Sequence, residues 1–94
     1  MKYLVIAANQ KSELGDQFCV FWKGAEEKDG FTSNTKHAYR FSQEELPTEK
    51  LRQIGAFAIP CYALRVEEEI KNKNDNMFET VELTTAMELL RDLP

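Results

Sequence analysis

Residues 17–46 read QFCVFWKGAEEKDGFTSNTKHAYRFSQEEL, and this stretch organises the rest of the chain. It contains the only tryptophan, Trp22, the only histidine, His37, and most of the phenylalanines. A hydrophobic N-terminal segment precedes it and a more acidic half follows it. Because large apolar side chains dominate the core of a small domain, we expect the core to form around this stretch.

The first part of this stretch predicts a strand. Apolar residues alternate along 17–23, which places them on two opposite faces. One face would carry Phe18, Val20 and Trp22, and the other Cys19 and Phe21. The apolar run at 3–8 does not alternate, which is typical of a strand covered on both faces. A short polar loop joins the two segments, so they predict an antiparallel hairpin.

Turn and helix signals follow. Residues 24–30 are charged and bounded by glycines, and we interpret them as a solvent-exposed hairpin tip. Residues 39–41 predict a short strand with both aromatic rings on one side. Ser42 and Glu45 match a capping box, so a helical turn should begin at Ser42. The main helix should begin near Pro47 and end at Gly55.

The C-terminal half predicts a second hairpin and a closing helix. Residues 56–60 end in Pro60 and suggest an edge segment. Residues 61–70 alternate as a half-exposed strand, 71–76 form a polar turn, and 77–83 return as a strand. A capping box at Thr85 and Glu88 would begin a helix with an apolar stripe. The stripe consists of Ala86, Leu89, Leu90 and Leu93.

Together these elements predict an α+β fold. We expect a mainly antiparallel sheet of about four or five strands with two helices packed on one face. The chain has 94 residues, 43% hydrophobic and 30% charged, which is ordinary for one domain spanning 1–94.

Charge and hydropathy make some classes of protein less favoured. The net charge is −4, with the acid concentrated after residue 41, whereas nucleic-acid-binding proteins usually carry a basic surface. Nucleic acid is therefore an unfavoured partner. The apolar run at the N-terminus is too short for a signal peptide, and no window approaches a membrane span. We expect a cytoplasmic protein that has no contact with membranes.

No catalytic or metal-binding pattern is present. Cys19 and Cys61 lie in apolar runs and predict two free thiols. Neither cysteine sits in a motif that pairs it with His37. One histidine and two distant cysteines lack the spacing of a zinc site, and the glycines do not form a phosphate loop. We therefore predict no catalytic residue, no cofactor and no metal.

An aromatic row, Trp22, Phe31, Tyr39 and Phe41, is the strongest constellation. Interleaved with Arg40 and two lysines, these rings could stack on bases. We favour the alternative that they form core, because so small a domain needs its large rings. As candidate partner-binding residues we select six. They are Trp22, Phe31, Tyr39, Arg40, Met87 and Leu90.

The row also carries a resemblance. The pattern Trp … Gly-aromatic-Thr … Ala-x-Arg-aromatic-Ser-x-Glu-Glu resembles small uncharacterised proteins of phages and prophages of Gram-positive bacteria. The resemblance covers about a third of the chain, from Phe21 to Glu45. This sequence departs from the pattern at Tyr39, where glycine is expected. The resemblance implies a phage or prophage origin and a bacterial host. It implies no particular activity.

Three functions remain open at this point. We expect a small non-enzymatic accessory protein that binds another protein. A nucleic-acid-binding module using residues 22–41 is the first alternative, and a small thiol-dependent enzyme is the second. We also expect a possible homodimer, formed through the closing helix or the aromatic face in preference to the acidic residues 67–69.

Overall fold

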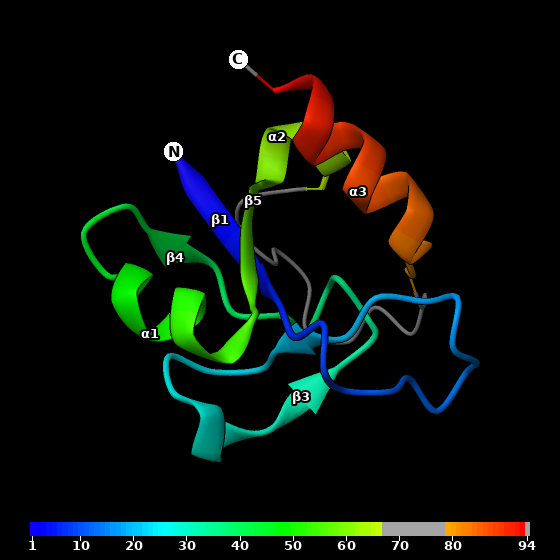
Figure 1. Ribbon diagram of the computed structural model, residues 1–94, viewed down its shortest axis with the longest axis horizontal. Coiled ribbons are helices and arrows are strands. Elements are labelled where there is room, and N and C mark those ends of the chain that lie inside the picture. Colours follow the sequence, from blue (N-terminus) through cyan, green and yellow to red (C-terminus); the bar gives the residue numbers. More distant parts are fainter. Residues whose placement is uncertain (67–78, 94) are drawn as a thin grey trace.

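The structure, a computed structural model, describes residues 1–66 and 79–93 and shows an α+β fold (Figure 1). Within these residues, five strands form one antiparallel sheet and three α-helices pack against it. The Cα radius of gyration is 12.3 Å, close to the roughly 12 Å expected for one compact domain of this length. The predicted fold class and strand number are confirmed.

Strand β1 (Lys2–Ile6) is the centre of the sheet. Along one edge it pairs with β5 (Phe57–Pro60), from Tyr3 opposite Pro60 to Ile6 opposite Phe57. Its other edge is shared by β4 (Phe41–Ser42) near its start and β2 (Phe21–Trp22) at its end. Strand β3 (Phe31–Thr32) pairs with β2 and forms the outer end of that side.

The core lies on both faces of the sheet, which confirms the two faces predicted for residues 17–23 and the cover predicted on both sides of the N-terminal strand. The first core cluster contains Leu4, Ile6, Cys19, Phe21, Ala38, Ile59, Cys61 and Ala86. The second core cluster contains Val5, Ala7, Val20, Trp22, Phe41, Leu51 and Ala56. Because successive side chains of a strand point to opposite faces, β1 supplies both clusters and is buried on both sides.

The helices divide between the same two faces, whereas we expected both on one. Helix α1 (Thr48–Ile54) places Leu51 in the second cluster. Helices α2 (Cys61–Leu64) and α3 (Leu83–Asp92) pack against the first cluster. Figure 1 shows α2 and α3 side by side, with α1 separate from them.

The strand predicted over 61–70 is wrong where the structure describes it. Residues Cys61–Leu64 are helix α2, and Arg65 ends it in a left-handed conformation with φ of 57°. Pro60 precedes the helix and ends β5, because proline cannot continue a sheet ladder. The edge segment predicted at 56–60 corresponds to β5. The rest of that predicted hairpin, 67–78, lies outside the described residues.

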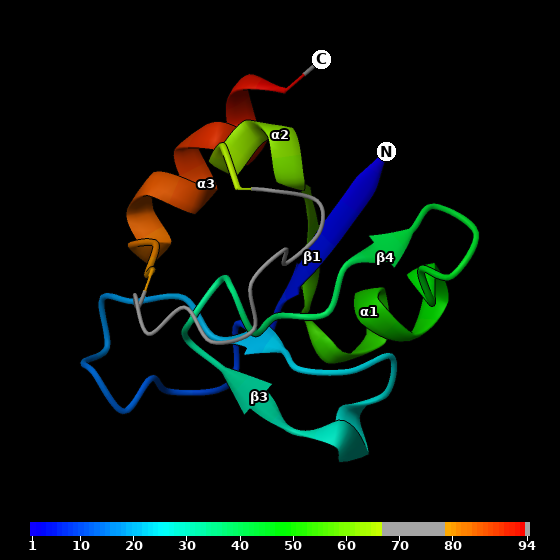
Figure 2. The ribbon, with the colours of Figure 1, turned by 180° about the vertical axis from the view of Figure 1, so that it is seen from behind.

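The return strand predicted at 77–83 is described only from residue 79, and its partner differs from the predicted one. The Cys19 N–H donates to the Val81 carbonyl at 2.8 Å, and the Leu83 N–H to the Gln17 carbonyl at 2.7 Å. Residues 81–83 therefore pair with 17–19, and no backbone hydrogen bond between described residues joins them to 61–66, although Thr80, Val81 and Glu82 line one hollow with residues 63–65. Figure 2 shows this connection between the start of α3 and the loop before β2.

The predicted closing helix is present as α3, but it begins at a different residue. It begins at Leu83 with Glu82 as the N-cap residue, so the capping box predicted at Thr85 and Glu88 is wrong. Ala86 is fully buried, and Leu89 and Leu90 pack against the first cluster. Among the described helices, none is long and apolar enough to cross a bilayer.

The two predicted turns and the main helix are confirmed. The tip between β2 and β3 is a short 3₁₀ turn, Glu27–Asp29, followed by Gly30 with φ of 94°. At the Ser42 turn, the Ser42 N–H donates to the Glu45 carboxylate at 2.9 Å, and the Glu45 N–H donates back to the Ser42 hydroxyl at 3.3 Å. Helix α1 ends at Gly55 with φ of 72°, a conformation that favours glycine.

Candidate protein-binding surface

Both cysteines are free and buried, as predicted. Burial raises the pKa of the Cys19 thiol from 9.0 to about 11. The reactive form of cysteine is the thiolate, and catalytic cysteines have lowered pKa values. Cys19 is therefore protonated at neutral pH and lacks the electrostatics of a nucleophile.

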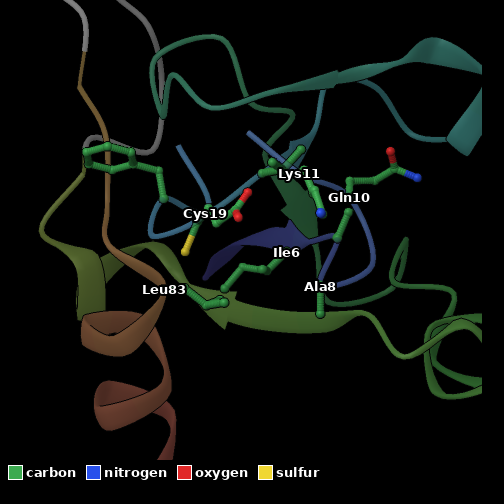
Figure 3. A pocket seen from close by; sticks show the side chains of 10 residues that line it. Ile6, Ala8, Gln10, Lys11, Cys19 and Leu83 are labelled. Atoms are coloured by element: carbon green, nitrogen blue, oxygen red, sulfur yellow. The ribbon is translucent and has the colours of Figure 1, made fainter. Parts of the chain in front are cut away.

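Cys19 lines a hollow of about 250 Å³ between the end of β1 and α3 (Figure 3). In Figure 3 the Cys19 sulfur and the Lys11 amine point to different parts of the hollow, so the only lysine of the lining is not aimed at the thiol. The other residues that line the hollow are Ile6, Ala7, Ala8, Gln10, Asp16, Phe18, Val20 and Leu83. Nothing in this lining activates the thiol.

Most of the aromatic row lies in the core. Trp22 is 1% exposed and meets Phe41 edge-on, with ring centroids 6.2 Å apart. Tyr39 meets Phe41 in the same manner at 4.7 Å. Trp22, which we selected as a partner-binding residue, therefore offers a partner no surface.

Tyr39 and Arg40 stabilise the turn that leads into β4. The Tyr39 hydroxyl donates to the Glu45 carboxylate at 2.5 Å, and this hydrogen bond raises the pKa of Tyr39. The pKa of Glu45 is lowered, first by the Ser42 N–H and then by the Tyr39 hydroxyl. The Arg40 guanidinium donates to the Thr35 carbonyl and, at 2.7 Å, to the Ala38 carbonyl. Arg40 is thus engaged within its own chain.

Met87 and Leu90 lie on α3. Both side chains are half-buried, and Leu90 packs against the first core cluster. Leu90 therefore contributes to the core, and only part of it is available to a partner.

Phe31 is the candidate that remains at the surface. It is 36% exposed on β3 and borders a hollow of about 290 Å³. Leu14, from the loop after β1, is 49% exposed and borders the same hollow. We call this feature the Leu14–Phe31 surface. Its remaining lining consists of Gln10, Lys11, Ser12, Glu13, Val20, Thr32 and Ser33.

Hydrogen bonds hold the loop that carries Leu14. The hydroxyls of Ser12 and Ser33 are 2.6 Å apart, which ties the loop to the residue after β3. The Leu14 N–H donates to the Ser12 hydroxyl at 3.1 Å. Gly15 has φ of 137°, a conformation that L side chains rarely adopt, and allows the chain to turn directly after Leu14. The surface is therefore built before any partner arrives.

The sequence alone did not reveal Leu14 as a site residue. It is the only large apolar residue in the polar loop 9–16, and an isolated leucine there was the available signal. The hollow depends on Leu14 and Phe31 meeting across 17 positions of sequence, which no local pattern encodes.

Across the described ranges, 1–66 and 79–93, no group of three His, Cys, Asp or Glu side chains could hold a metal ion. Comparisons with protein-family models, with curated proteins and with solved structures found no match. The surface therefore has to be interpreted from its own geometry. Two exposed apolar side chains around a small hollow with hydroxyl and amide groups can contact a peptide segment.

Proposed function

We propose that this chain is a small non-enzymatic accessory protein that acts by binding another protein, and that the partner contacts the Leu14–Phe31 surface. The observation that carries the proposal is the pair of exposed apolar side chains, Leu14 and Phe31, at the rim of one hollow. Aromatic side chains such as phenylalanine are enriched in protein interfaces, and the residues that contribute most binding energy lie in well-packed pockets.

The size and lining of the hollow support a peptide in preference to a small molecule. At about 290 Å³ it is at or below the lower end of the roughly 300–1,000 Å³ typical of small-molecule sites. Its polar lining is mainly hydroxyl and amide groups, which pair with the backbone of a peptide as readily as with side chains.

The two alternative functions find less support. The nucleic-acid hypothesis needs stacked aromatics and free cations, yet Trp22 is buried and Arg40 donates to two backbone carbonyls. The thiol-enzyme hypothesis needs a low pKa, and burial raises that of Cys19. No observation favours nucleic-acid binding or thiol catalysis over protein binding.

The resemblance to phage and prophage proteins adds a proposed setting. We infer an accessory protein of phage or prophage origin that acts in the cytoplasm of a bacterial host. Two free cysteines fit a reducing compartment. The genes adjacent to this one test the origin, since structural or regulatory phage genes should flank it.

Site-specific photo-crosslinking tests the binding surface. A photoreactive phenylalanine at Phe31 should give a discrete cross-linked product in cells of the native host. Adding Leu14→Glu should remove that product, because a carboxylate at the rim disfavours an apolar contact. Phe57, 41% exposed and absent from the lining of this hollow, is the matched control position.

The same product from Phe31 and Phe57 would indicate unspecific contact, and a product that survives Leu14→Glu would place the interface elsewhere. Either result contradicts the proposal. We also propose a homodimer formed through α3, since Met87 and Leu90 on this helix are half-exposed. Light scattering at micromolar concentration decides between a mass near 10.9 kDa and twice that value. Met87→Glu, which spares the core, should dissociate a dimer formed through α3.

A further inference from the structure

The backbone of β3 has one side facing β2 and one side facing outward. The Lys23 N–H donates to the Gly30 carbonyl at 2.9 Å, and Phe21 is the register partner of Thr32. Alternate residues of an antiparallel strand direct their N–H and C=O to the same side. Gly30 and Thr32 therefore direct theirs toward β2, and Phe31 directs its N–H and C=O away from the sheet.

This outward edge has no partner in the part of the chain that the structure describes. Strand β3 is the terminal strand on its side of the sheet. Among residues 1–66 and 79–93, no turn or loop hydrogen bond uses the Phe31 N–H or C=O. Exposed sheet edges are commonly protected by lysine or proline on the strand, and residues 31–33 contain neither.

We propose that the partner binds by adding an extended segment to the β3 edge, antiparallel to β3, with its side chains entering the Leu14–Phe31 hollow. This inference rests on the proposed function and specifies its mode. Main-chain hydrogen bonds would supply part of the affinity and the hollow the specificity, as in other cases of strand addition. Because β3 has only two residues, the side-chain contact in the hollow is required as well.

The register determines which side chains of the partner matter. Phe31 and Trp22 are register partners and share the face of the second core cluster, as does Val20. A partner residue opposite Phe31 therefore directs its side chain over the hollow, whereas the residue opposite Thr32 directs its side chain to the other face. The segment should carry apolar side chains at the positions opposite Phe31 and Ser33.

The acidic residues just before β3 favour a basic residue in the partner segment. In the described structure, Glu26 pairs with Lys28 at 3.0 Å and Glu27 with Lys50 at 3.3 Å, whereas the Asp29 carboxylate makes no ion pair and accepts the Glu26 N–H at 3.0 Å. Asp29 lies two residues before Phe31. Asp29 ends the 3₁₀ turn before β3, so the strand register does not pair it with a partner residue. Its carboxylate is exposed at this end of β3, so a lysine or arginine C-terminal of the Phe31 partner is favoured. The expected ligand is thus an extended segment with two alternate apolar residues followed by a basic one.

Selection from a displayed library of random 12-residue peptides tests this inference with the full chain as bait. The selected peptides should be enriched in that pattern, and Leu14→Glu should weaken their binding about tenfold or more. On binding, the Phe31 amide should become protected from hydrogen exchange in NMR spectra. Replacing Phe57 by serine is the matched control and should leave affinity unchanged.

An N-methyl scan along one selected peptide isolates the main-chain contact. Methylating the amide opposite Phe31 removes a hydrogen bond and should weaken binding about tenfold. Methylating the amide opposite Thr32, which points away from β3, should have little effect. The expected result is therefore one sensitive amide with tolerant neighbours.

The outcomes separate the two proposals. Peptides that Leu14→Glu weakens, but that tolerate every N-methyl group and leave Phe31 unprotected, overturn strand addition and leave the binding surface intact. A failure to select any peptide that depends on Leu14 overturns both. Protection of Phe31 that rises with protein concentration in the absence of peptide identifies a second copy of this chain as the occupant and overturns the foreign segment.

Discussion

The buried Thr35 hydroxyl donates a hydrogen bond to the Glu79 carboxylate at 3.0 Å, across 44 positions of sequence. The backbone strengthens this contact, because the Thr35 N–H donates to the Glu79 carbonyl at 2.8 Å and the Glu79 N–H donates to the Asn34 side chain at 3.2 Å. Residues 79–82 therefore attach α3 to the turn that precedes β4.

The side-chain contact can be measured by a double-mutant cycle of Thr35→Val and Glu79→Ala. We expect a coupling free energy of about 1 kcal/mol, typical of one hydrogen bond, from urea denaturation. Thr84→Val on the exposed side of α3 is the control and should show no coupling to Glu79→Ala. A coupling near zero for Thr35 would mean that the backbone bonds alone hold the segment.

The thiol of Cys19 predicts a pH dependence of stability. Its pKa is about 11 in the folded protein against 9.0 for the ordinary group. Above pH 9 the unfolded chain loses the proton while the folded chain keeps it, so this contribution to stability is full below pH 9 and is lost as the pH rises toward 11. Denaturation from pH 8 to 11 should show a decline that Cys19→Ala reduces. An identical decline in both proteins would contradict the assignment.

Replacing Gly15 should strain the backbone of the loop that carries Leu14. A Cβ there would lie 2.7 Å from the Gln17 side-chain oxygen, and φ is 137°. Gly15→Ala should therefore lower the free energy of unfolding by about 1 kcal/mol or more. The double variant Gly15→Ala/Gln17→Ala removes the collision but not the backbone strain. It should recover only part of the loss, and full recovery would show that φ carries no cost here.

The Tyr39–Glu45 contact predicts a titration change. Tyr39→Phe removes a hydrogen bond that lowers the pKa of Glu45, so the pKa of that carboxyl should rise toward its ordinary value. NMR titration of the Glu45 side-chain carboxyl measures this directly. Tyr62→Phe, a change at an exposed tyrosine of α2, should leave the titration unaltered. The Ser42 N–H remains in place, so the shift should be partial.

Local signals were sufficient for much of the fold. Alternation predicted which of Cys19, Val20, Phe21 and Trp22 lie on each face, and Gly55 marked the end of α1. The alternation at residues 61–66 was misleading, because Cys61 and Leu64 are also three positions apart and share one side of a helical turn. Pro60 was the signal that favoured a new element there.

The remaining features depend on contacts between distant segments. Whether a ring such as Trp22 or Phe31 is covered depends on how far the edge of the sheet extends, and Phe31 lies on its terminal strand. The pairing of 81–83 with 17–19 likewise follows from tertiary packing. The candidate site combines one residue of the aromatic row with a leucine from a loop, and only the folded chain brings the two together.

The position of β1 has a consequence for biosynthesis. A ribosome makes this strand before any of its three partners, and β5, which pairs with four of its five residues, follows only after Phe57 has been added. Until then Leu4, Val5 and Ile6 belong to an unpaired apolar segment that can associate with other nascent chains or with a chaperone. Pairings this distant in sequence are formed late and slowly. The yield of folded protein should therefore depend on the rate of translation through β5 more than on the stability of the finished sheet.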